Sequence, residues 1–146
     1  MFRDKTGNDK INKAMGIAED FLWNHLSVIK KEDHFTYTNQ TVKQVYETIK
    51  SHLAKETYIE VDLYKSKWPW SKAIAYTTKG SSKLFINSRH IPDRSVEDYV
   101  NTLTHEFLHL CGYSHGSNNP KGKEQSIPYR IGQLAENYAR ALLPIL

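Results

Sequence analysis

The sequence has few of the features that would cross-link the chain or hold it in a membrane. It contains one cysteine, Cys111, so no disulfide can form within the chain. It has no apolar run long enough to span a bilayer, and the charged residues 1–10 are followed by no apolar segment typical of a secretion signal. These absences favour a cytoplasmic protein with no membrane partner, although a removed leader would still allow export.

Charge of one sign is not concentrated anywhere in the chain. The net charge is +4 over 146 residues, and the lysines are scattered. This distribution favours a solvated basic surface over a nucleic-acid-binding patch. The length and a hydrophobic content of 39% suit one globular domain over residues 1–146, with an extra N-terminal helix in residues 1–32. We expect the protein to be a monomer.

Residues 105–115 indicate a metal-binding site, because they contain three histidines, a glutamate and a glycine in the pattern H-E-x-x-H-x-x-G-x-x-H. On an α-helix, His105 and His109 are one turn apart, so both rings can reach one ion. Gly112 can adopt a positive φ, end the helix and let the chain bring His115 to the same ion. Three neutral imidazoles are typical of a catalytic zinc site with a fourth position open to water. Glu106 is placed to take a proton from that water, so the motif predicts one Zn²⁺ ion and a general base.

Apolar periodicity and turn residues predict a single α+β domain. We expect helices over residues 10–30, from a cap at Asn39 or Thr41 to 55, over 95–110 and over 128–143. Strands are expected over 34–38, 58–64, 72–78 and 83–88, with residues 79–82 joining the last two as a hairpin. Ser95 and Asp98 predict a capping box that begins the helix of the motif.

From about Phe35 onward, the motif and the order of elements resemble the metzincin clan of zinc metallopeptidases. The resemblance implies a zincin-like fold, in which a small twisted mixed sheet packs on the active-site helix and a C-terminal helix follows. It implies that His105, His109 and His115 bind zinc and that Glu106 is the catalytic base. It also implies that a peptide or protein substrate lies along an unpaired edge strand, for which Ala73-Ile74-Ala75-Tyr76 is the candidate.

The sequence departs from metzincins after the third histidine. Those enzymes have a methionine turn there, whereas the methionines of this chain are Met1 and Met15. The corresponding place reads Ser126-Ile127-Pro128-Tyr129. The resemblance implies that Tyr129 stabilises the oxyanion of the reaction, and the alternative is a tyrosine packed at the start of a helix.

The same stretch is also similar to the YbeY family of rRNA-maturation endoribonucleases, which have the pattern H-G-x-L-H-L-x-G-Y-D-H. Leu108, Leu110 and Tyr113 match that pattern, but Glu106 stands where that family has glycine. Peptide hydrolysis at zinc needs a base for the water, so Glu106 favours a zinc-dependent endopeptidase. The alternatives are a metal-dependent endoribonuclease and a non-catalytic domain stabilised by zinc.

Three further positions allow two interpretations each. Glu136 on the last expected helix is either a third zinc ligand, as in thermolysin-like gluzincins, or a salt-bridged carboxylate. Trp68 and Trp70 either line a substrate subsite or cover the end of the sheet.

Overall fold

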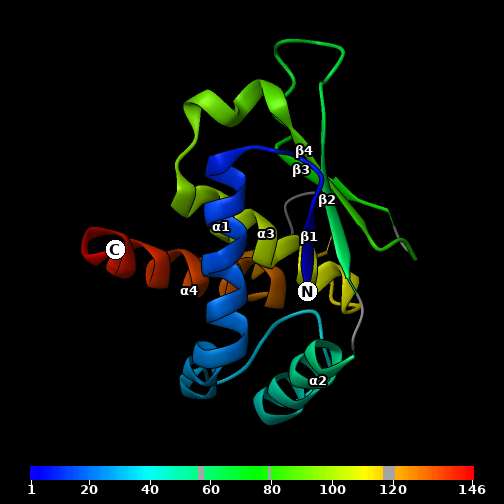
Figure 1. Cartoon of the computed structure of the whole chain (residues 1–146). Helices are drawn as coiled ribbons and strands as arrows, with labels where there is room; N and C mark the ends of the chain where they lie inside the picture. Colours follow the sequence, from blue (N-terminus) through cyan, green and yellow to red (C-terminus); the bar gives the residue numbers. More distant parts are fainter. Residues whose placement is uncertain (56–57, 79, 117–120) are drawn as a thin grey trace.

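The computed structural model describes residues 1–55, 58–78, 80–116 and 121–146. It is an α+β fold with four α-helices and four strands in this described part (Figure 1). In chain order these elements are β1 (Phe2–Asp4), α1 (Asp9–Asp20), α2 (Val42–Ala54), β2 (Ile59–Tyr64), β3 (Ala75–Thr77), β4 (Lys83–Asn87), α3 (Val96–Leu110) and α4 (Ile127–Leu142). Shorter helical turns are η1 (Phe21–His25), η2 (Leu26–Lys31), η3 (Ser88–Asp93), η4 (Lys123–Gln125) and η5 (Leu143–Ile145).

The strands form one mixed sheet in the order β1-β2-β4-β3. The first three of these are parallel to one another, and β3 runs antiparallel to β4, with Tyr76 opposite Phe85. Because side chains alternate across a strand, Val61 of β2 and Leu84 and Ile86 of β4 lie in the core. The order places β3 at the edge of the sheet. Of the predicted edge segment 73–76, only Ala75 and Tyr76 belong to the strand, which is shorter than the expected 72–78.

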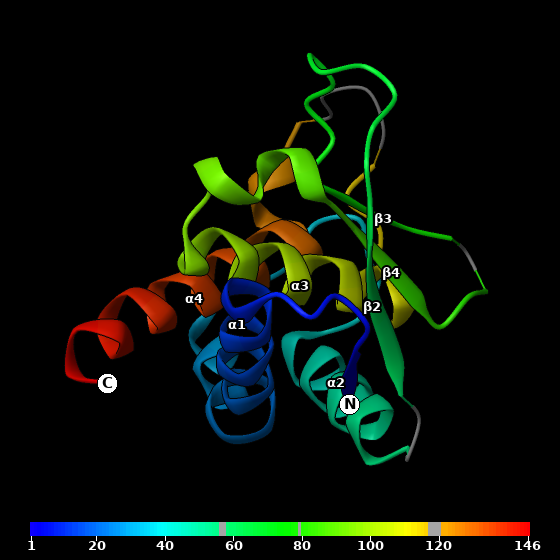
Figure 2. The ribbon, with the colours of Figure 1, turned by 45° about the horizontal axis from the view of Figure 1, so that its top comes forward.

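Helix α3 lies at the centre of the helical layer. Figure 2 shows the sheet at the right, with α1, α3 and α4 to its left. Helix α3 packs against both α1 and α4 and also contacts β3. Its Tyr99, Val100 and Leu103 are fully buried, and Phe107 is nearly so. The helix therefore presents one side to the core and leaves its opposite side for the histidines.

Two expected elements differ from the structure. The expected helix over residues 10–30 is helical throughout, but α1 ends at Asp20 and continues as a π-helical turn and a 3₁₀-helix. The strand predicted over residues 34–38 is wrong, because only Thr36 forms a bridge, to Ser126. Tyr37 has a φ of 61°, which turns the chain out of the extended conformation. Sequence analysis also missed β1, whose pairing with β2 joins distant parts of the chain.

The described helices include none that is both long and apolar enough to cross a bilayer. This agrees with the absence of a long apolar run in the sequence.

The contact between α3 and α4 depends on a glycine. A Cβ at Gly132 would lie 2.5 Å from Oδ1 of Asn101, whose amide donates a hydrogen bond to Glu136 across the two helices (3.0 Å). We expect Gly132→Ala to lower the free energy of unfolding by about 1–3 kcal/mol, because the helices must separate or Asn101 must move. Gly16→Ala is the matched control, since a Cβ on α1 there meets no atom within 4 Å. Urea denaturation measures both, and equal effects would contradict this account of the packing.

Candidate metal centre

Backbone signals at both ends of α3 determine where the histidines stand. Ser95 and Asp98 form the predicted capping box, each side chain bonding the other residue's backbone N–H. At the other end Gly112 has a φ of 97°, and the N–H of Tyr113 donates to the carbonyl of Leu108 (3.1 Å). This is a Schellman motif, which reverses the chain immediately after the second histidine.

The three histidines of the motif converge, as predicted. One nitrogen from each of His105, His109 and His115 lies within 4.8 Å of the others. The Nε2 atoms of His105 and His109 are 3.1 Å apart. Two nitrogens bound to a tetrahedral zinc ion, each at about 2.05 Å, are separated by about 3.3 Å. The spacing of this pair therefore fits a shared ion.

Backbone carbonyls hold the other side of these rings. Nδ1 of His109 donates to the carbonyl of Tyr113 (2.9 Å), and Nδ1 of His115 donates to that of Gly116 (2.9 Å). The backbone of Pro128, at the start of α4, lies near His105 and slightly opposes the lowering of its pKa. A proton fixed on Nδ1 leaves the lone pair on Nε2 free to bind a metal. Sequence reasoning could not find these partners, because any residue type supplies a carbonyl.

The environment keeps the imidazoles of His105 and His109 neutral. Burial lowers the pKa of His105 to about 3, helped by the neighbouring His109 and His115. Burial likewise lowers the pKa of His109. Since a metal binds only the neutral imidazole, these side chains would lose no protons on binding at neutral pH.

Glu106 lines the same cleft as the three histidines and is held by the edge strand. Its Oε2 accepts a hydrogen bond from the hydroxyl of Thr77 on β3 (3.1 Å). Burial raises the pKa of Glu106 to about 7, and the bond from Thr77 partly opposes the rise. A carboxyl with a pKa near neutral can both take up and release a proton, as acid–base catalysis requires.

The segment at residues 126–129 packs directly against the histidines. The ring of Tyr129 meets those of His105 and His115 edge-on, with centroids 4.8 and 4.9 Å apart. The bridge between Thr36 and Ser126 ties this segment to the chain that precedes α2. The place compared with a methionine turn thus contacts the histidines through an aromatic ring.

The histidines open into a cleft of about 890 Å³ between α3 and the β3–β4 hairpin. Ala75, Tyr76 and Thr77 of β3 form one wall, and Leu110 and Cys111 lie at the C-terminal end of α3. Burial raises the pKa of Cys111 to about 12, so its thiol is protonated at neutral pH, and Cys111 is not part of the histidine cluster. The cleft therefore combines the three imidazoles, one carboxylate and the edge of a sheet.

The structure also shows the surroundings of Glu136, Trp68 and Trp70, for which the sequence allowed two interpretations. Glu136 lies outside the histidine cluster and forms a salt bridge with Arg140 (2.6 Å), which favours the structural interpretation. Trp68 and Trp70 are 53% and 73% exposed, so more than half of each side chain faces solvent. Neither tryptophan is among the described residues that line the cleft.

Comparisons with known proteins identified no similar protein. No family model matches the chain, and neither the curated proteins nor the solved structures gave a significant match.

The geometry predicts that each chain binds one zinc ion. We expect His115→Ala to weaken zinc binding at least about 100-fold, because it removes one of three converging nitrogens. His34→Ala is the control, since His34 is exposed and outside the cluster. Competition with a chromophoric chelator measures the affinity. Full zinc affinity in His115→Ala, with loss of zinc in Glu136→Gln, would replace His115 by Glu136 as the third ligand.

Proposed function

We propose that this protein is a zinc-dependent endopeptidase with a zincin-like fold. The observation that carries the proposal is the position of Glu106. Its side chain lines the same cleft as the three imidazoles and accepts a hydrogen bond from Thr77 on the edge strand β3. A metal site that serves only to stabilise a fold is usually closed by four protein ligands. Here three nitrogens and a neighbouring carboxylate face a large cleft, which supports a catalytic role.

In the proposed reaction, His105, His109 and His115 would hold the metal. Bound zinc would supply Lewis acidity, polarising a peptide carbonyl and lowering the pKa of water. Glu106 takes a proton from the attacking water and later delivers it to the leaving amine. Thr77 is a positioning residue, because its hydroxyl fixes one oxygen of Glu106 and leaves the other free.

Strand β3 is the proposed binding site for the substrate backbone. It pairs with β4 on one side only, and within the described part of the chain no strand covers its other edge. Ala75, Tyr76 and Thr77 line the cleft. An extended peptide can add to this edge through backbone hydrogen bonds, which recognise any sequence.

The charge of the cleft argues against the ribonuclease alternative. Of the described residues that line it, none is a lysine or an arginine. Proteins that bind RNA neutralise its phosphates with such side chains, and binding is weak without them. Lys123 lies near His105 and over the ring of Tyr129, but it is not among the described residues that line the cleft. A lining without cationic side chains beside a sheet edge suits a peptide better than a polyanion.

The role of Glu106 can be tested by replacing its carboxylate with an amide of the same size. We expect Glu106→Gln to lower the hydrolysis of denatured casein by about 10²–10⁴-fold, because the amide cannot accept the proton. Zinc content should stay at one ion per chain. Glu136→Gln is the matched control, since that carboxylate is paired on α4 outside the cleft.

Two results would overturn the proposal. One is full casein hydrolysis by Glu106→Gln. The other is cleavage of single-stranded or structured RNA by the zinc-loaded wild type, with no hydrolysis of casein or of a broad peptide library.

Tyr129 is proposed as a positioning residue that acts through its ring. Its edge-on contacts with His105 and His115 do not need the hydroxyl. We expect Tyr129→Phe to keep both zinc affinity and kcat, and Tyr129→Ala to weaken zinc binding about 10–100-fold, the usual cost of losing support for a ligand. If Tyr129→Phe instead lowers kcat with unchanged KM and zinc affinity, the hydroxyl takes part in the reaction, as the metzincin resemblance implies.

A further inference from the structure

The loop between β2 and β3, residues 65–74, carries two aromatic side chains into solvent. It projects beyond the rest of the molecule at the top of Figures 1 and 2. Trp68 and Trp70 are stacked on each other, with ring centroids 5.1 Å apart and an interplanar angle of 19°. They remain 53% and 73% exposed, which is unusual for large apolar side chains without a partner.

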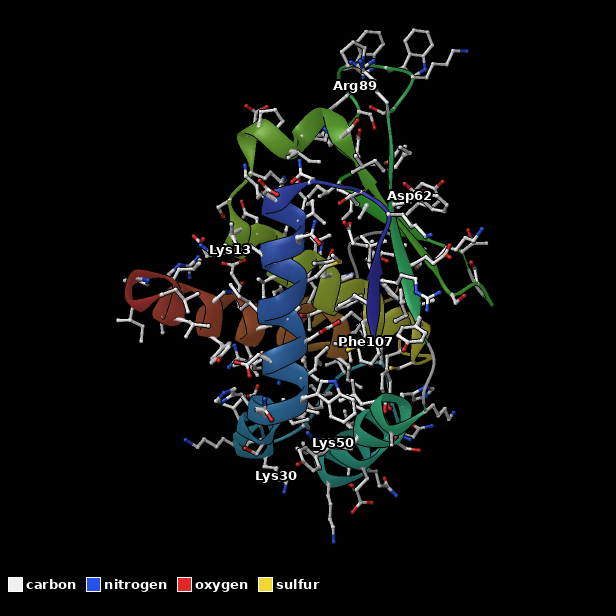
Figure 3. The ribbon with its side chains drawn as sticks, viewed as in Figure 1. Lys13, Lys30, Lys50, Asp62, Arg89 and Phe107 are labelled. Atoms are coloured by element: carbon white, nitrogen blue, oxygen red, sulfur yellow. The ribbon has the colours of Figure 1, made fainter. Side chains whose placement is uncertain are left out.

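Hydrogen bonds at the base of the loop hold this exposed pair in place. The side chain of Asn87, fully buried, accepts a bond from the N–H of Ser66 (3.3 Å) and donates one to the carbonyl of Ala73 (2.9 Å). Arg89, labelled in Figure 3, donates to the carbonyl of Ser66 (2.7 Å), and His90 bonds the carbonyl of Ser71 (2.6 Å). The fold therefore fixes both ends of the loop and presents its tip.

The loop is also basic. Residues 65–74 include Lys65, Lys67 and Lys72 and no acidic residue. All three lysines are exposed, and none of them forms a salt bridge within the described chain. The ammonium of Lys67 lies 5.4 Å from the centre of the Trp68 ring. Three exposed lysines thus lie in the same loop as the apolar rings of Trp68 and Trp70.

We propose that this loop docks the protein on the surface of an anionic phospholipid bilayer, in place of the expectation of no membrane partner that the lack of a long apolar run suggested. Tryptophan is enriched at the boundary between headgroups and acyl chains, where its apolar rings are buried and its N–H stays hydrated. Lysines beside such an anchor are attracted to the phosphate and carboxylate groups of anionic lipids. Trp68 and Trp70 supply the insertion, and Lys65, Lys67 and Lys72 supply the preference for charge.

The geometry favours a lipid surface over a single-stranded nucleic acid. Stacking proteins offer free ring faces in a positively charged groove. Here one face of Trp68 is covered by Trp70, and the Lys67 ammonium lies over the ring as well. The rings stand at a projecting tip, which can enter a headgroup layer but cannot enclose a strand.

Vesicle flotation of the full chain tests the proposal. The vesicles are phosphatidylcholine alone, or phosphatidylcholine and phosphatidylserine in equal amounts. We expect at least about tenfold tighter binding to the mixed vesicles, weakened by added salt. The variant Trp68→Ser/Trp70→Ser should lose most of this binding. Lys65→Gln/Lys67→Gln/Lys72→Gln should lose the preference for phosphatidylserine.

Trp23→Ser is the matched control, because Trp23 is 45% exposed on η1, at the far end of α1 from the loop. It should bind as the wild type does. In a Trp23→Phe background, brominated lipids should quench the fluorescence of the remaining tryptophans.

Equal binding to both vesicle types, no quenching, or equal losses in Trp23→Ser and Trp68→Ser/Trp70→Ser would overturn the proposal. So would binding to single-stranded oligonucleotides in the absence of binding to vesicles.

Discussion

Helix α3 contributes to the hydrophobic core with one side and to the cleft with the other, and the rest of the structure depends on this double role. Its Tyr99, Val100 and Leu103 are enclosed by neighbouring helices, while its histidines face a cleft. Because 3.6 residues make a turn, one helix places its core residues on one side and its histidines on the other, and its two ends set where this pattern starts and stops. The capping box at Ser95 and the reversal at Gly112 provide those ends. Packing on α1, α4 and β3 then fixes the helix in space.

Electrostatics and geometry support the same chemistry at the cleft. Desolvation favours the neutral form of an imidazole, and the backbone carbonyls choose which nitrogen carries the proton. The same desolvation favours the protonated form of Glu106, and the Thr77 hydroxyl counteracts it. One buried environment thus favours neutral imidazoles at His105 and His109 and raises the pKa of the Glu106 carboxyl to about 7. Nearly all of the polar partners involved come from outside α3, from β3, the Gly112 turn and the start of α4.

The sequence predicted what depends on local spacing. The ends of α2 and α3, the β3–β4 hairpin and the converging histidines follow from capping residues, turn residues and helical periodicity. It failed where the structure depends on distant contacts. Strand β1 is short and forms only through pairing with β2, and residues 34–38 look extended but turn at Tyr37. The hydrogen bonds that Thr77 and the carbonyls of Tyr113 and Gly116 form with the site leave no pattern in the sequence.

The arrangement of the strands has a consequence for how the protein folds. The β3–β4 hairpin joins near neighbours in the chain, whereas Phe2 of β1 pairs with Ile59 of β2 across both α1 and α2. Closing such a long loop costs entropy before any contact compensates for it. The hairpin and α3 can therefore assemble the cleft early, and β1 joins the sheet late. Pairing with β1 therefore covers the backbone N–H and C=O groups along one edge of β2, which would otherwise be open to strands of other chains.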